Sequence, residues 1–110
     1  MMKLAMSPAA AGLFRALLGR AGIERHRILL TDFRSVDWNS LTFAGERHII
    51  SLRIPGPGAA AVAAALISGL EEADFNIPGQ IVADITLAVP PANQADDAII
   101  VEIEALTVGE

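Results

Sequence analysis

Four segments of this 110-residue chain alternate apolar and polar residues with a period of two. In a β-strand, successive side chains point to opposite faces, so this alternation predicts strands with one buried and one open face. Ile50, Leu52 and Ile54 alternate with Ile49, Ser51 and Arg53 in one segment. The four predicted strands are 27–35, 47–54, 80–89 and 98–107.

Two further segments have the spacing of amphipathic helices. Residues 8–20 carry the i, i+4 pairs Leu13–Leu17 and Phe14–Leu18, and residues 59–73 carry Val62, Leu66 and Leu70 on one stripe. Ser7-Pro8 fits an N-cap followed by proline at the first helical position, and Pro55-Gly56-Pro57-Gly58 is a turn before the second helix. Lys3 and the uncharged stretch 4–14 weakly match a secretory signal, but Pro8 and Gly12 interrupt that stretch.

The resulting order, α-β-β-α-β-β, predicts an α+β fold in a single domain, 1–110. We expect a two-layer sandwich: a four-stranded antiparallel sheet with two helices on one face, in a permuted ferredoxin-like topology. Strands 47–54 and 98–107 would be central, because the helix between 47–54 and 80–89 requires a crossover. Residues 36–45 would be a connection with a short strand at 41–43, and residues 90–97 a loop.

The two halves also align by residue type. A shift of 52 positions places Phe14 on Leu66, Asp32 on Asp84 and Phe33 on Ile85, whereas 51 suits the second strand of each half better. Shared strand periodicity could produce the same matches. A duplicated αββ unit, with pseudo-repeats at about 8–54 and 59–108, is therefore a hypothesis.

Charge is divided unequally along the chain. All eight basic residues lie in 1–53 with four acids, whereas residues 54–110 carry nine acids and no base. With a net charge of −5, the chain is poorly suited to nucleic acid, and no apolar run is long enough for a membrane span. The absence of cysteine excludes disulfides and favours a reducing compartment. We expect a cytoplasmic, bacterial protein.

The open face of the predicted sheet is the main candidate surface. It would carry polar side chains together with the apolar Leu30, Ile49, Val82 and Ile100. A solvated face with ion pairs from Arg53 to Glu102 or Glu104 is the plain alternative to a ligand site or a partner surface. The candidate binding residues are Arg34, Trp38, His48, Arg53, Asp84, Glu102 and Glu104.

Residues 37–48 form a second candidate region. They hold the only tryptophan, and a tryptophan on a connection can stack on a ligand, anchor an interface or cap the core. A His–carboxylate pair for acid–base chemistry at His48, or a cation held by Asp84, Glu102 and Glu104, has less support, because no catalytic or metal motif is present. We expect no cofactor, no metal and no catalytic residue.

The sequence does not specify a biochemical activity. The leading hypothesis is a non-enzymatic binding or assembly domain that works as a homodimer, since an uncovered, partly apolar sheet face favours self-association. The alternative is a small enzyme or small-molecule-binding protein, with its site on the open face or near Asp37, Trp38 and His48. A basic protein partner is a third hypothesis, based on the acidic second half.

Overall fold

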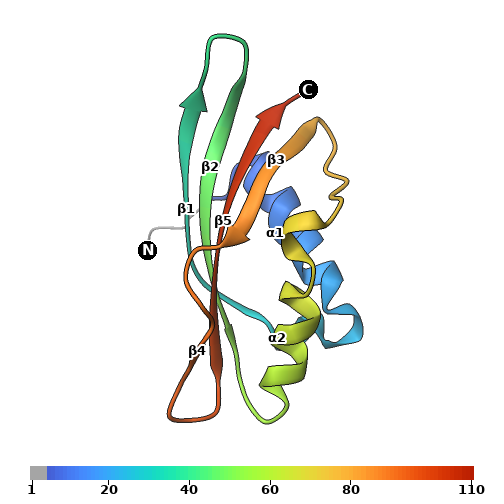
Figure 1. Cartoon of the computed structure of the whole chain (residues 1–110), viewed down its shortest axis with the longest axis vertical. Coiled ribbons are helices and arrows are strands. Elements are labelled where there is room, and N and C mark those ends of the chain that lie inside the picture. The colour runs from blue at the N-terminus through green and yellow to red at the C-terminus, as the bar shows by residue number, and fades with distance from the viewer. Residues whose placement is uncertain (1–4) are drawn as a thin grey trace.

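The protein is a two-layer α+β domain, described here from a computed structural model that covers residues 5–110. An antiparallel sheet forms one layer and two helices cover one of its faces (Figure 1). Lys3 and Leu4, part of the possible signal segment, lie outside the described residues. The elements are α1 (Pro8–Arg20), η1 (Gly22–Arg27), β1 (Leu29–Asn39), β2 (Ala44–Ile54), α2 (Ala59–Ile67), η2 (Leu70–Glu72), β3 (Gln80–Leu87), β4 (Ala92–Asn93) and β5 (Ile99–Gly109).

The predicted start and end of α1 are correct. Ser7 is the N-cap, and its hydroxyl accepts a hydrogen bond from the Ala10 backbone N–H at 3.1 Å. Pro8 occupies the first helical position, where the missing N–H costs nothing. Leu13 and Leu17 are fully buried, so this helix packs on the sheet through the expected stripe.

The second helix is shorter than predicted. It ends at Ile67, because Gly69 has a φ of 66°, and a separate 3₁₀ turn, η2, follows. Arg20 of α1 reaches the end of α2 and donates to the Leu66 carbonyl at 2.7 Å. A guanidinium thus satisfies a helix C-terminal carbonyl and fixes the two helices together.

The sheet has five strands, which corrects the predicted four. The order is β1-β2-β5-β3, so β2 and β5 are central as expected, and β4 pairs with β5. β4 lies within the segment predicted to be a loop. Because β3 ends at Leu87, the first residues of β5 have a free side, and Ala92 and Asn93 pair there with Ile100 and Ile99.

The first hairpin is longer than predicted. β1 continues through residues 36–39, and residues 41–43 form no strand but belong to the tight turn between Asn39 and Ala44. The Ser40 N–H donates to the Phe43 carbonyl at 2.8 Å and closes this turn. The hairpin projects past the helices (Figure 1), and Leu41 at its tip is fully exposed.

Two β-bulges change the face of the sheet on which some side chains lie, compared with the prediction. The register shifts between Leu30 and Asp32 and again between Val82 and Asp84. Because a bulge adds one residue, side chains before it change face. Leu30 and Val82 therefore pack against the core instead of lying on the open face, whereas Leu29 and Ile81 are about half exposed.

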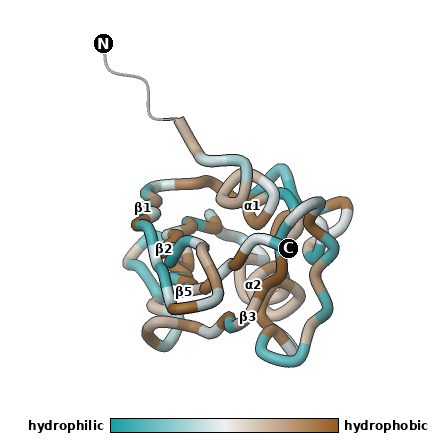
Figure 2. The backbone as a smooth tube through the Cα atoms, turned by 90° about the horizontal axis from the view of Figure 1, so that it is seen from above, coloured by the Kyte–Doolittle hydropathy of each residue, from teal (hydrophilic) through white to brown (hydrophobic). Residues whose placement is uncertain are grey.

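The core lies between the sheet and the helices. Figure 2 shows these layers end-on, with the strands on one side and α1 and α2 on the other. Its fully buried members include Leu13, Leu17, Ile50, Leu52, Ile54, Leu66, Val101 and Ile103. Each central strand thus buries alternate residues and leaves the others on the uncovered face. Within residues 5–110, no helix is both long and apolar enough to cross a bilayer.

Candidate functional site at the open sheet face

One end of the open face is mainly apolar, and the rest of the face mixes charged and apolar side chains. The strand register groups its side chains into rows that cross the sheet: Trp38–Gly45–Val108–Ile81, then Val36–Arg47–Leu106–Asp84, then Arg34–Ile49–Glu104–Thr86. We call Val36, Trp38, Ile81, Leu106 and Val108 the apolar end. Val36 is 51% exposed and Ile81 49% exposed, which is high for branched aliphatic side chains on a sheet.

Both signs of charge lie on this face, on different strands, and Ile49 and Ile100 lie among them as predicted. Arg34, Arg47 and Arg53 lie on β1 and β2, whereas Asp84, Glu102 and Glu104 lie on β3 and β5. Asp32 on β1 is the exception. The register places five candidate residues on this face as predicted: Arg34, Arg53, Asp84, Glu102 and Glu104.

The ion pairs differ from the predicted ones. Arg53 lies opposite Ile100 and pairs with Asp96 in the loop before β5, instead of with Glu102 or Glu104. Glu104 forms an ion pair with Arg47, with 3.2 Å between guanidinium and carboxylate. The hydrogen bond from Arg53 lowers the pKa of the Asp96 carboxyl. Among residues 5–110, Arg34 and Asp84 form no ion pair, so both remain available to a partner.

Trp38 lies on β1 and belongs to the open face, which corrects its predicted place on a connection. It is opposite Gly45, where an added Cβ would stand 1.9 Å from the Thr107 carbonyl oxygen. The close approach of β2 to β5 therefore requires glycine. Val108 lies next to Gly45 in the same row and is only 6% exposed. Trp38 is the bulkiest side chain of the apolar end.

His48 lies on the other face of the sheet, in the core. Its ring is fully buried and links three strands: Nδ1 is 2.8 Å from the Ser35 hydroxyl of β1, and Nε2 is 2.8 Å from the Thr107 hydroxyl of β5. Burial lowers the pKa of this imidazole, and the nearby Glu46 carboxylate partly opposes that shift. His48 is therefore a structural histidine that no solvent-borne ligand reaches.

The candidate region at Asp37, Trp38 and His48 is divided between the two faces. Asp37 is paired with Glu46, and Ser35 with His48, on the side that the helices cover, whereas Trp38 lies on the open side. Neighbouring residues of a strand point to opposite faces. This separation was not predicted, because residues 36–45 were expected to be a connection. In the described residues, no three histidine or carboxylate side chains are placed to hold a metal ion.

Sequence reasoning missed Val36, Leu106 and Val108. The alternation of Ser35, Val36, Asp37 and Trp38 was the available signal, because it continues the strand beyond the predicted end at 35. The residues Ser35 and Thr107, which bind His48, had no local signal.

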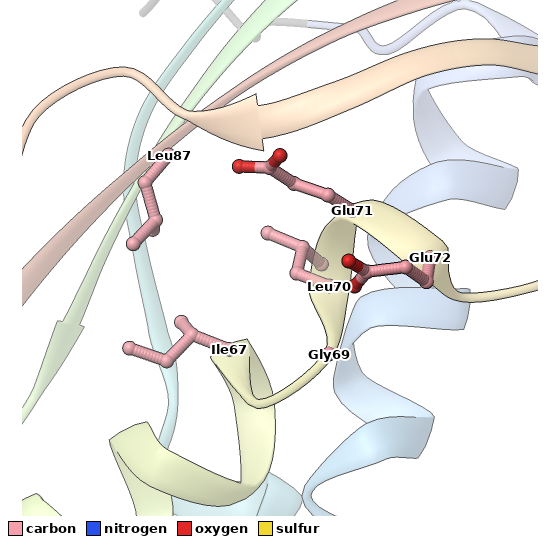
Figure 3. Close-up of a pocket in the computed structure, with 6 residues that line it drawn as sticks. All are labelled: Ile67, Gly69, Leu70, Glu71, Glu72 and Leu87. Atoms are coloured by element: carbon pink, nitrogen blue, oxygen red, sulfur yellow. The ribbon is translucent and has the colours of Figure 1, made fainter.

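Two hollows lie beside the edge strand β3, and of their lining residues only Ile81 belongs to the open face. One, of about 290 Å³, is lined by Ile67, Gly69, Leu70, Glu71, Glu72 and Leu87 (Figure 3). The other, of about 380 Å³, is lined by residues 73–77 together with Gln80, Ile81, Val82 and Glu110.

Comparison with known proteins identifies no family for this chain. No family model matches the chain, and no curated protein matches it. The function is therefore argued from the arrangement of the side chains on the sheet.

Proposed function

We propose that this domain is a non-enzymatic assembly module that forms a homodimer through its open sheet face. The observation that carries the proposal is the distribution of side chains on that face. A cluster of apolar residues lies at one end, further apolar residues lie among the charges, and most basic and acidic residues stand on opposite halves of the sheet.

This distribution is self-complementary about one particular axis. A two-fold axis parallel to the strands, midway between two facing sheets, places β1 over the partner's β3 and β2 over the partner's β5. Each row then meets its own copy in reverse order. Trp38 meets Ile81, Gly45 meets Val108, and the arginine-bearing strands face the strands that carry Asp84, Glu102 and Glu104.

The other in-plane axis is less favourable. A two-fold axis across the strands would place β1 over β1 and β5 over β5, so arginine would face arginine and glutamate would face glutamate. It would also set the apolar end against the far end of the sheet, where Arg53 lies. Like charges across an interface cost affinity, which favours the strand-parallel axis.

Light scattering on the purified chain tests the dimer. At micromolar concentration the wild type should scatter as twice the 11.5 kDa of one chain. Val36→Glu should weaken the dimer at least tenfold, because it sets a carboxylate opposite the partner's Asp84 in the Val36–Asp84 row. Ile23→Glu is the matched control, since Ile23 is 86% exposed on η1, away from the sheet.

A charge swap tests the axis. Arg34→Glu should also weaken the dimer, and adding Asp84→Arg in the same chain should restore part of the lost affinity. A wild type that stays monomeric at low and high salt would refute the proposal. Hydrogen exchange distinguishes this face-to-face dimer from one in which β1 or β3 of two protomers pair edge to edge. Only the edge-to-edge dimer would protect the amides of an edge strand on association.

We also propose the finer topology: a permuted ferredoxin-like sandwich that arose by duplication of an αββ unit. The order β1-β2-β5-β3, with β5 between the strands that α2 connects, supports the permutation. The two bulges support the duplication, because they lie 52 positions apart, the shift that aligned the halves. Separate expression of 5–54 and 59–110 tests it: halves that reassociate into one folded complex support two equivalent units.

A further inference from the structure

The outer edge of β3 is unpaired in the described part of the chain. β3 ends the strand order, and its ladder runs to β5 alone. Within residues 5–110, no backbone hydrogen bond links Ile81–Leu87 to any segment other than β5. This edge therefore offers free N–H and C=O groups to an extended segment.

Two hollows follow one another along this edge. The hollow near the end of β3 has Ile67, Leu70 and Leu87 as its apolar wall, with Glu71 and Glu72 at its rim (Figure 3). The hollow near the start of β3 has Phe75, Ile77 and Val82 as its apolar wall. Val82 and Leu87 pair with Thr107 and Ile103, which are four residues apart on β5, or about 13 Å along a strand. Side chains four positions apart in an extended segment lie on the same face. An extended segment can therefore place one apolar side chain in each hollow.

Carboxylates surround both hollows. Glu71, Glu72, Asp74, Asp84 and Glu110 are all exposed, and the chain has no basic residue after Arg53. The ion pairs within residues 5–110 involve none of them. Glu71 is held by a hydrogen bond from the Thr86 hydroxyl at 2.9 Å, so one carboxylate of the rim is fixed beside the strand. This charge attracts a cationic partner and repels a second copy of the same edge.

We propose that the β3 edge binds an extended, lysine- or arginine-rich segment of another protein. The segment adds a short strand beside Asp84–Leu87, places apolar side chains in the two hollows, and directs its cations to the acidic rim. The bulge between Val82 and Asp84 limits regular pairing to the last four residues of β3. Recognition therefore depends on the hollows and the charges. This site shares only Ile81, Asp84 and Thr86 with the open face, and it is argued from the β3 edge and the two hollows, so the proposal does not rest on the dimer.

NMR titration of the ¹⁵N-labelled full chain tests the proposal. The probe is a ten-residue peptide with leucines four positions apart, lysines and threonines elsewhere, and a capped N-terminus. We expect saturable shifts of the amides of residues 67–77 and 82–87, with none centred on Trp38 or Leu106. Glu71→Gln combined with Glu72→Gln should weaken binding about fivefold, in keeping with exposed charges.

The controls separate this site from general attraction between opposite charges. Asp97→Asn, in the loop before β5, should bind the peptide as tightly as the wild type, because asparagine tolerates its φ of 65°. A peptide with glutamate for each lysine should not bind. Equal binding of a peptide whose leucines are adjacent, an undiminished affinity of the double variant, or shifts spread over the whole surface would each refute the proposal.

Discussion

At the scale of single residues, His48 makes the stability of the protein depend on pH near neutrality. The imidazole is buried and neutral, and its folded-state pKa lies below the ordinary 6.5. The unfolded chain therefore binds a proton at a higher pH than the folded chain does. The stabilisation is present above about pH 6.5 and is lost as the pH falls below that value towards the folded-state pKa.

Urea unfolding between pH 7.5 and pH 5.5 tests this expectation. The free energy of unfolding should fall as the pH falls, by at most about 1.4 kcal/mol per pH unit for one proton. His48→Gln should lose most of this slope, whereas His26→Gln at an exposed position on η1 should keep it. A wild-type slope that survives in His48→Gln would assign the effect to other groups.

Gly45 is the second decisive residue. An alanine Cβ there would stand 1.9 Å from the Thr107 carbonyl oxygen, so β2 and β5 would have to separate at the apolar end. Gly45→Ala should destabilise the protein by about 1–3 kcal/mol, as overpacking does. Gly109→Ala is the matched control, because a Cβ there meets only the Ala44 carbonyl oxygen at 3.8 Å. Thermal unfolding of both variants measures the difference.

At the scale of elements, the two helices end for different reasons, and two glycines should respond in opposite directions. Gly19 lies within α1 with no neighbour within 4 Å of an added Cβ, so Gly19→Ala should stabilise by about 0.5–1 kcal/mol. Gly69 also has open space around it but a φ of 66°. Gly69→Ala should therefore destabilise by about 1 kcal/mol. Two stabilising alanines in chemical denaturation would contradict this account of the end of α2.

The strands show where local pattern is sufficient and where it fails. Period-two alternation identified all four long strands, because each central strand buries one face. It could not detect a bulge, since an extra residue changes nothing in the local pattern until the partner strand is aligned. The prediction therefore reversed Leu29 with Leu30 and Ile81 with Val82.

At the scale of the whole molecule, the unequal charge of the two halves contributes to folding. Arg47–Glu104 and Arg53–Asp96 both join the basic first half to the acidic second half. Raising the salt concentration from about 0.05 to 0.5 M should lower the free energy of unfolding only slightly, because these pairs are exposed and salt screens them. The double variant Arg47→Gln, Arg53→Gln should show less salt dependence in the same denaturant titrations. Stability that rises with salt in the wild type would show that repulsion among the carboxylates dominates.

The sequence by itself determined α1, from its Ser7 cap to Arg20, and the central places of β2 and β5. It also determined that five candidate residues lie on the open face: Arg34, Arg53, Asp84, Glu102 and Glu104. These follow from capping, periodicity and chain order, which act between near neighbours. The tertiary structure decided that Trp38 and His48 lie on opposite faces, that Ser35 and Thr107 hold the buried imidazole, and that Arg53 pairs with Asp96. The physical reason is that each of these contacts joins residues distant in sequence, so it depends on strand register, which exists only once the strands have paired.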